Sequence, residues 1–277
     1  MLDLHMHTTC SDGIDNPKEL LKKVIAAGCK LFSVTDHDCI EAINEINSEL
    51  KAYKHDITFI SGMEVSSVFK GHALHILCYN FDCGHESIAG LFEEKKRLRV
   101  KKIAALFEHL SEKHGIIIPQ SDIMEILSHP CPKKSHIAEA ALKNGLTDLP
   151  KYDFITKYLE DMDKVAFNLP AEKVIHATCT AGGFTSFAHP IKMQNRYDMD
   201  YDALDNFIRL LADCGLYAIE AYHYLHKESD VKNCKVLAKK YNLKITAGSD
   251  YHGKKEYTGV ANLGTDDANC ILKGLPL

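Results

Sequence analysis

The sequence lacks several features that would assign it to a specialised class of protein. It has no tryptophan, no CxxC pair among its 10 cysteines, and no apolar run long enough to cross a membrane. Scattered cysteines of this kind, several of them within apolar segments, indicate free thiols in a reducing compartment. The first ten residues lack both a basic segment and an apolar segment, so they are not predicted to be a signal peptide. We therefore expect a cytoplasmic protein that does not bind a membrane.

An excess of positive charge is also absent. The chain has 33 Lys and Arg against 38 Asp and Glu, a formal net charge of -5, which argues against binding to duplex nucleic acid. The 45% hydrophobic and 26% charged residues are typical of a globular protein, and 277 residues allow one large domain or two small ones. The 16 histidines in this acidic chain favour a metal site.

Short apolar segments alternate with amphipathic segments in the first ninety residues and again near the C-terminus. This alternation predicts parallel βαβ units and therefore an α/β sheet or barrel. The first predicted helix begins with Pro17 and ends before Gly28, both of which are typical of those positions. The predicted strands are 2–4, 31–35, 57–60, 73–79, 183–188, 217–221 and 243–247. The predicted helices between them are 17–27, 39–53, 202–214 and 229–241.

The middle of the chain interrupts this alternation. Two long helical patterns, at 91–113 and 135–143, occur there with few strand signals, and a basic run (KKRLR) lies near the start. The sequence therefore predicts a helical insertion over residues 87–173. The α/β barrel would then be formed by residues 1–86 and 174–277.

Histidine and acidic residues lie at or near the ends of six predicted strands. In parallel α/β folds, ligands bind at the carboxyl ends of the strands. Residues spaced as HxH or DxH point the same way from an extended backbone, so each pair can chelate. Imidazole and carboxylate groups together suit Zn, Mn or Fe, and Mg is possible. Nine candidate ligands are too many for one ion, so we expect two or three divalent ions, with Glu64 and Asp250 as bridging carboxylates. The nine are His5, His7, Asp12, His37, Glu64, His75, His189, Asp250 and His252.

The order of these motifs resembles that of the PHP phosphoesterases, the polymerase and histidinol phosphatase family. The motifs are HxHT, SDG, TDHD, GxE, a strand histidine, AHP and a late GSDxH, and together they cover nearly the whole chain. The resemblance implies a distorted (β/α)7 barrel with a trinuclear metal centre, in which Asp12, His37 and His252 are also catalytic. It implies one ion held by His5, His7, Glu64 and Asp250, a second by Glu64, His75 and His189, and a third by Asp12, His37 and His252.

The predicted insertion resembles that of one subgroup of this family. The subgroup has a basic run followed by a GRPHxA motif, and it acts on 3',5'-nucleoside bisphosphates or short RNA. Here the motif appears as KKSHIA over residues 133–138, so lysine and serine replace its arginine and proline. Lysine keeps the charge but not the bidentate geometry of arginine. The substrate contacts implied by the resemblance are Arg99, Lys134, Ser135, His136 and His226.

The predicted function is that of a metal-dependent phosphoesterase. Its substrate would be a phosphorylated small molecule, either a nucleotide such as a 3',5'-nucleoside bisphosphate or a short oligoribonucleotide, cleaved by a metal-bound hydroxide. Two alternatives stay open at this point, namely a histidinol-phosphate phosphatase and a non-catalytic metal-binding module. Asp36 and Asp38 are predicted to orient His37 or cap the next helix rather than bind metal.

Overall fold

The computed structural model describes residues 1–51, 53, 57–129, 132–160, 162, 165–260 and 263–276. The chain forms two compact units, one made of residues 1–92 and 169–277 and the other of residues 93–168. Across those described ranges, no helix combines the length and the apolarity needed to cross a bilayer. The nine cysteines within them are free thiols, as predicted, and Cys131 lies outside the described residues.

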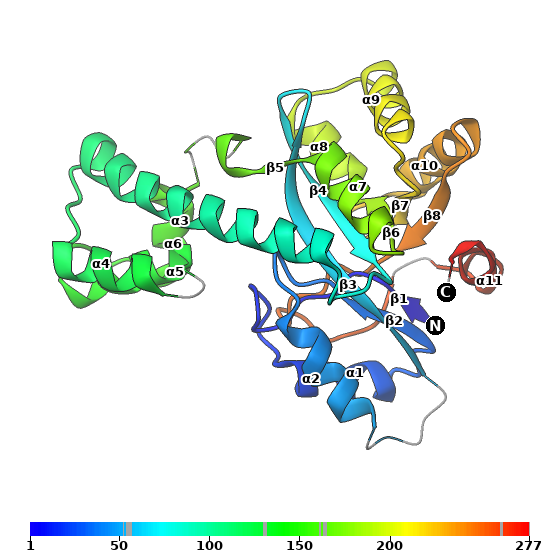
Figure 1. Ribbon diagram of the computed structural model, residues 1–277, viewed down its shortest axis with the longest axis horizontal. Coiled ribbons are helices and arrows are strands. Elements are labelled where there is room, and N and C mark those ends of the chain that lie inside the picture. The colour runs from blue at the N-terminus through cyan, green and yellow to red at the C-terminus, as the bar shows by residue number, and fades with distance from the viewer. Residues whose placement is uncertain are drawn as a thin grey trace. The chain divides into compact units, whose positions relative to one another are not determined.

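The first unit is a distorted (β/α) barrel built on a single sheet (Figure 1). The strand order is β1-β2-β3-β4-β6-β7-β8, and the short β5 pairs with β3. The sheet is nearly closed, because Leu4 N donates to Ala247 O at 3.0 Å and Met6 forms a parallel bridge with Tyr251. The strands are β1 (Leu2–Asp3), β2 (Leu31–Val34), β3 (Thr58–Phe69), β4 (His72–Tyr79), β5 (Leu169–Pro170), β6 (Phe184–Phe187), β7 (Ala218–Tyr222) and β8 (Lys244–Ala247).

The predicted parallel βαβ units are present, but the strand β4 departs from this pattern. This strand pairs antiparallel with both β3 and β6, whereas β1–β2–β3 and β6–β7–β8 are parallel. The cause is a tight turn after Phe69, which is paired with His72 across two residues. Those two residues, Lys70 and Gly71, have φ values of 48° and 79°, as a two-residue hairpin requires. A connection this short forces the next strand to reverse.

The strand β3 is also longer than the predicted segment 57–60. It runs for 12 residues, so Glu64 lies within the strand instead of following it. Ser66 pairs with His75 on β4, and Glu64 lies two residues before Ser66. The side chains of Glu64 and His75 therefore project from the same face of the hairpin. The reversal of β4 brings a histidine from the first half of that strand to the site.

The helix α1 begins at Pro17 as predicted and ends at Ala26, one residue before the predicted end. The side chain of Asn16 accepts a hydrogen bond from Glu19 N at 2.9 Å, Asn16 N donates to the Glu19 carboxylate at 3.0 Å, and Pro17 occupies the first turn. Gly28, with a φ of 70°, follows the helix end.

The helices of this unit are α1 (Pro17–Ala26), α2 (Glu41–Leu50), α7 (Ala171–Thr180), α8 (Pro190–Arg196), α9 (Tyr201–Asp213), α10 (Glu228–Lys240) and α11 (Thr265–Gly274). The first residues of α3 also belong to it.

The second unit is helical and has its own hydrophobic core, in which Leu106, Leu110 and Phe154 are fully buried. Its boundaries at residues 93 and 168 lie inside the predicted limits of 87 and 173, because α7 packs against strands of the barrel. A role for this unit in the substrate site stays a prediction. Its helices are most of α3 (Glu86–His114), with α4 (Gln120–Ser128), α5 (Lys134–Lys143), α6 (Lys151–Tyr158) and the 3-10 helix η1 (Val165–Phe167).

Candidate metal centre

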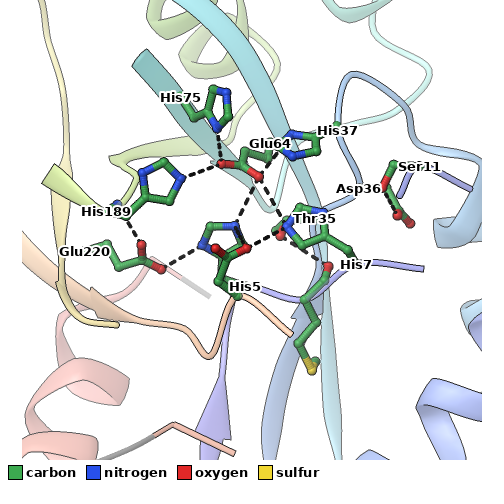
Figure 2. Close-up of polar contacts among 12 residues, drawn as sticks. His5, His7, Ser11, Thr35, Asp36, His37, Glu64, His75, His189 and Glu220 are labelled. Carbon is green, nitrogen blue, oxygen red and sulfur yellow. Dashed lines mark hydrogen bonds and ion pairs between the residues drawn. The ribbon is translucent and has the colours of Figure 1, made fainter. Parts of the chain in front are cut away.

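A buried carboxylate, Glu64, lies at the centre of a cluster of imidazole rings (Figure 2). Five ring nitrogens lie within 3.3 Å of its two oxygens. They belong to His75 (Nδ1, 2.6 Å) and His189 (Nε2, 3.0 Å) near Oε1, and to His5 (Nε2, 3.1 Å), His37 (Nδ1, 3.1 Å) and His7 (Nε2, 3.3 Å) near Oε2. One carboxylate group thus connects side chains from four separate segments of the barrel.

A second carboxylate, Asp250, lies on the other side of His5 and His7. Its Oδ1 lies 3.2 Å from His7 Nε2 and 3.5 Å from His5 Nε2, and its Oδ2 lies 3.2 Å from His223 Nε2. The Nδ1 atom of His252 is 3.5 Å from the same Oδ1. His5 and His7 therefore each lie between two carboxylates.

The third carboxylate, Asp12, marks the open edge of the cluster. Its oxygens lie 3.3 Å from His252 Nε2, 3.7 Å from His7 Nδ1 and 3.9 Å from His37 Nε2. The Asp12 side chain is 55% exposed, whereas those of His7 and Glu64 are almost completely buried. Solvent and a ligand can reach the cluster from this edge.

Two of the clustered residues have unusual backbone conformations. His189 has a φ of 31° and Asp250 a φ of 51°, in the left-handed region that non-glycine residues seldom occupy. Such conformations are costly and are concentrated at functional sites. The fold therefore holds these two side chains in place at a cost to its stability.

The donor set fits divalent metal ions. Three groups bring ligand atoms within 4.8 Å of one another, and they share His7, His37 and Glu64. Both ring nitrogens of His7 are buried and close to carboxylates, yet neither is aligned for a hydrogen bond with any described residue. This arrangement is expected when an ion lies between the groups. The three groups are His5, His7, Glu64 and Asp250; His37, Glu64 and His75; and His7, Asp12, His37 and His252.

The electrostatics of the cluster favour cation binding. Burial opposes ionisation of Glu64, but the surrounding imidazoles hold its pKa well below the usual range. Burial lowers the pKa of His37 to about 4 and that of His189 to about 3, so both are neutral at physiological pH. Burial also opposes the charge of His7, yet the carboxylates of Asp250 and Glu64 raise its pKa to about 10. A cation bound to these groups would take the place of that proton.

Two buried residues outside the predicted set support the cluster. Glu220 on β7 accepts a hydrogen bond from His189 N at 2.7 Å and lies 2.9 Å from His5 Nδ1. His223, which contacts Asp250, was missed, although it directly follows β7 just as other histidines follow their strands. Glu220 gave a weak signal because it lies inside its strand, where an acidic residue has no distinctive spacing.

Asp36 and Asp38 accept hydrogen bonds from neighbouring segments of the site. Asp36 accepts hydrogen bonds from Thr8 N (2.7 Å), Thr8 Oγ1 (2.6 Å) and Ser11 Oγ (2.5 Å). Asp38 accepts from Ser66 N at 2.8 Å, and the side-chain cap of α2 is not made by either of them. The expectation that either residue caps the next helix is therefore wrong, whereas the expectation that they orient His37 stays a prediction.

The predicted substrate contacts fall into two sets. Arg99, Lys134, Ser135 and His136 lie in the helical unit, where Lys134 Nζ is 3.7 Å from Glu160 and His136 Nδ1 accepts from Lys133 N at 3.3 Å. His226 lies in the barrel unit, is buried, and has its Nδ1 2.9 Å from Ala221 O. Their binding of a substrate stays a prediction.

Several characterised proteins are similar to this chain over most of their length. A 5'-3' exoribonuclease of Haemophilus influenzae is 30% identical over 264 residues, covering 90% of this chain and 89% of that protein. A phosphoribosyl 1,2-cyclic phosphate 1,2-diphosphodiesterase of Eggerthella lenta is 28% identical, with coverages of 91% and 94%. A 3',5'-nucleoside bisphosphate phosphatase of Chromobacterium violaceum is 26% identical, with coverages of 92% and 88%.

The fold is shared with solved structures. An amidohydrolase from Chromobacterium violaceum superposes with a TM-score of 0.76 at 24% identity, covering 95% of this chain and 92% of that one. A putative metal-dependent phosphoesterase from Bifidobacterium adolescentis gives a TM-score of 0.74 at 23% identity, with coverages of 99% and 96%. Residues 3–221 match the family described as the PHP domain, a range that contains seven of the nine candidate ligands and the supporting Glu220, but not Asp250 and His252. The chain therefore belongs to the PHP-domain family of metal-dependent phosphoesterases.

Proposed function

We propose that this metal-dependent phosphoric ester hydrolase acts on a phosphate ester of a small nucleotide, such as a 3',5'-nucleoside bisphosphate, or on a short oligoribonucleotide. The observation that carries the proposal is the set of five imidazole nitrogens around the buried Glu64. The names of the exoribonuclease and bisphosphate phosphatase relatives support a nucleotide or RNA substrate.

Asp250 and His252 lie beyond the range 3–221 that matches the family. The assignment of those two residues to the centre therefore depends on their distances to His5, His7 and Asp12.

We propose that Mn, Fe or Zn ions occupy the three groups, with Mg possible. When bound, such ions lower the pKa of a coordinated water and stabilise negative charge on phosphoryl oxygens. Glu64 and Asp250 would hold ions from the buried side. Asp12, His37 and His252, whose side chains are 55%, 26% and 20% exposed, would orient the water and the substrate from the open edge. We assign the roles in this way because solvent reaches Asp12, His37 and His252, whereas the side chains of Glu64 and Asp250 are buried.

The chain's own groups fix the protonation states that this chemistry needs. His5 faces Glu220 with Nδ1 and Glu64 with Nε2, so the carboxylate of Glu220 selects the ring nitrogen that stays available. Arg99, Lys134, Ser135 and His136 are proposed to contact the substrate from the helical unit. Lys134→Ala should then raise KM for a nucleotide more than it lowers kcat.

The direct test is a phosphate-release screen on purified protein supplied in turn with Mn, Zn, Fe and Mg. The substrates are adenosine 3',5'-bisphosphate, short RNA and histidinol phosphate. We expect release from the bisphosphate or the RNA, and a loss of about 100-fold or more in Glu64→Ala. Glu45→Ala, which removes an exposed carboxylate from α2, is the matched control.

The outcomes separate the alternatives. A preference for histidinol phosphate would overturn the nucleotide assignment. Hydrolysis of none of the substrates with any of the four metals would favour a non-catalytic metal-binding module. Full activity in Glu64→Ala would show that the cluster is not the active site.

A further inference from the structure

A lysine that the functional assignment does not use lies beside the metal centre. Lys192 is on α8, three residues after His189, and its Nζ is 3.9 Å from Asp250 Oδ2. That separation is too long for a hydrogen bond. The same oxygen already lies 3.2 Å from His223 Nε2. Asp250 therefore attracts the ammonium group of Lys192 electrostatically, but it accepts no hydrogen bond from that group.

The side chain of Lys192 is accessible to a ligand. It is 38% exposed, whereas the Asp250 side chain beneath it is 5% exposed. A small pocket next to it is lined by His75, His189, Lys192 and Arg196, together with Ala73, Leu74 and Met193. The pocket thus joins two candidate metal ligands to two cationic side chains.

This juxtaposition fits a phosphoryl group. The neighbouring ligand groups would hold ions that supply positive charge to a phosphate, and the ammonium group of Lys192 would donate to one of the phosphate oxygens. Charge-assisted hydrogen bonds from lysine to phosphate are short and strong. The terminal phosphate of a monoester carries up to two negative charges, whereas a diester carries one, so an added cation favours the monoester.

We propose that Lys192 binds a non-bridging oxygen of the phosphoryl group under attack and favours phosphomonoesters over phosphodiesters. This inference rests on the proposed function and adds to it the preferred class of ester. It concerns only residues of the barrel unit. The competing role for Lys192 is to neutralise Asp250, which would affect metal retention but not anion binding.

The first experiment measures anion binding without turnover. Mn-loaded wild type, Lys192→Ala, Lys192→Arg and Lys22→Ala are titrated calorimetrically with inorganic phosphate, and their metal contents are measured. Lys22 is an exposed lysine on α1, so its variant makes the same change in net charge. We expect about 10-fold or greater weakening in Lys192→Ala, partial retention in Lys192→Arg, and no change in Lys22→Ala. The metal content should be the same in all four.

The second experiment compares two esters, p-nitrophenyl phosphate and bis(p-nitrophenyl) phosphate. The ratio of kcat/KM for the monoester to that for the diester should fall about 10-fold in Lys192→Ala. Unchanged phosphate affinity together with an unchanged ratio would overturn the inference, as would loss of metal alone. If the wild type hydrolysed neither ester, the phosphate titration would decide the role of Lys192, and the phosphate-release screen on nucleotides and RNA would decide the proposed function.

Discussion

At the scale of the residue, Glu220 affects two candidate ligands although it belongs to none of the three ligand groups. One of its oxygens lies 2.9 Å from His5 Nδ1 and the other accepts from His189 N at 2.7 Å. A histidine that donates from one ring nitrogen presents the lone pair of the other. Glu220 therefore determines which atom of His5 faces Glu64 and Asp250.

Glu220→Gln should weaken metal binding by about 10- to 100-fold. An amide has one accepting oxygen, so it cannot serve both His5 Nδ1–H and His189 N–H. The measurement is a Mn titration of the metal-free protein, with circular dichroism to check the fold. Glu228→Gln, an exposed first-turn residue of α10, is the control. Equal affinities for the two variants would contradict the positioning role.

The burial of His226 should make the free energy of unfolding depend on pH. Burial lowers its pKa, its Nδ1 lies 2.9 Å from Ala221 O, and its Nε2 is buried with no hydrogen-bond partner in the described part of the chain. The unfolded chain takes up a proton at about pH 6.5, whereas the folded form resists it. This residue therefore lowers the stability of the fold as the pH falls below about 6.5.

Urea unfolding of metal-free protein at about pH 7 and about pH 5 tests this dependence. His226→Gln keeps a donor but does not titrate, so it should lose less stability than wild type between the two conditions. His176→Gln, which changes an exposed histidine on α7, should behave as wild type. Equal losses in the two variants would show that burial of His226 is not the cause.

At the scale of the element, the hairpin of β3 and β4 explains most of what the sequence could not predict. Helix α1 was predictable because Pro17 and Gly28 are strong local signals. The length of β3 and the reversal of β4 depend on the turn at Lys70 and Gly71 and on pairing between distant strands. Lysine at a positive φ gives little signal in a sequence.

The loop after β8 must approach β1 closely, and Gly248 allows this. A Cβ atom at this position would lie 2.1 Å from His5 Cβ and 2.6 Å from Glu220 Oε1. Gly248→Ala should therefore destabilise the fold by about 1–3 kcal/mol and weaken metal binding through displacement of His5. Chemical unfolding and a Mn titration measure the two effects.

Gly90→Ala is the matched control for this prediction. Among the described residues, nothing lies within 4 Å of the added Cβ, and Gly90 is inside the helix α3. Alanine should stabilise the helix there by about 0.5–1 kcal/mol. A Gly248→Ala protein as stable as wild type would show that the loop moves aside without cost.

At the scale of the whole molecule, the candidate ligands come from segments as far apart as His5 and His252. Their convergence was predictable because strand ends in an α/β fold meet at one edge. His223 and Glu220 were harder to find, since their importance arises from contacts with Asp250 and His5 that only the folded chain makes. The substrate contacts assigned to the helical unit rest on motif similarity alone.

The measurement that tests the central claim most directly is elemental analysis of the purified protein after growth in metal-replete medium. We predict at least two transition-metal ions per chain in the wild type, in keeping with three overlapping ligand groups, and their loss in Glu64→Ala. A folded wild-type protein that carries no transition metal and takes up none on addition of Mn, Fe or Zn would contradict the account.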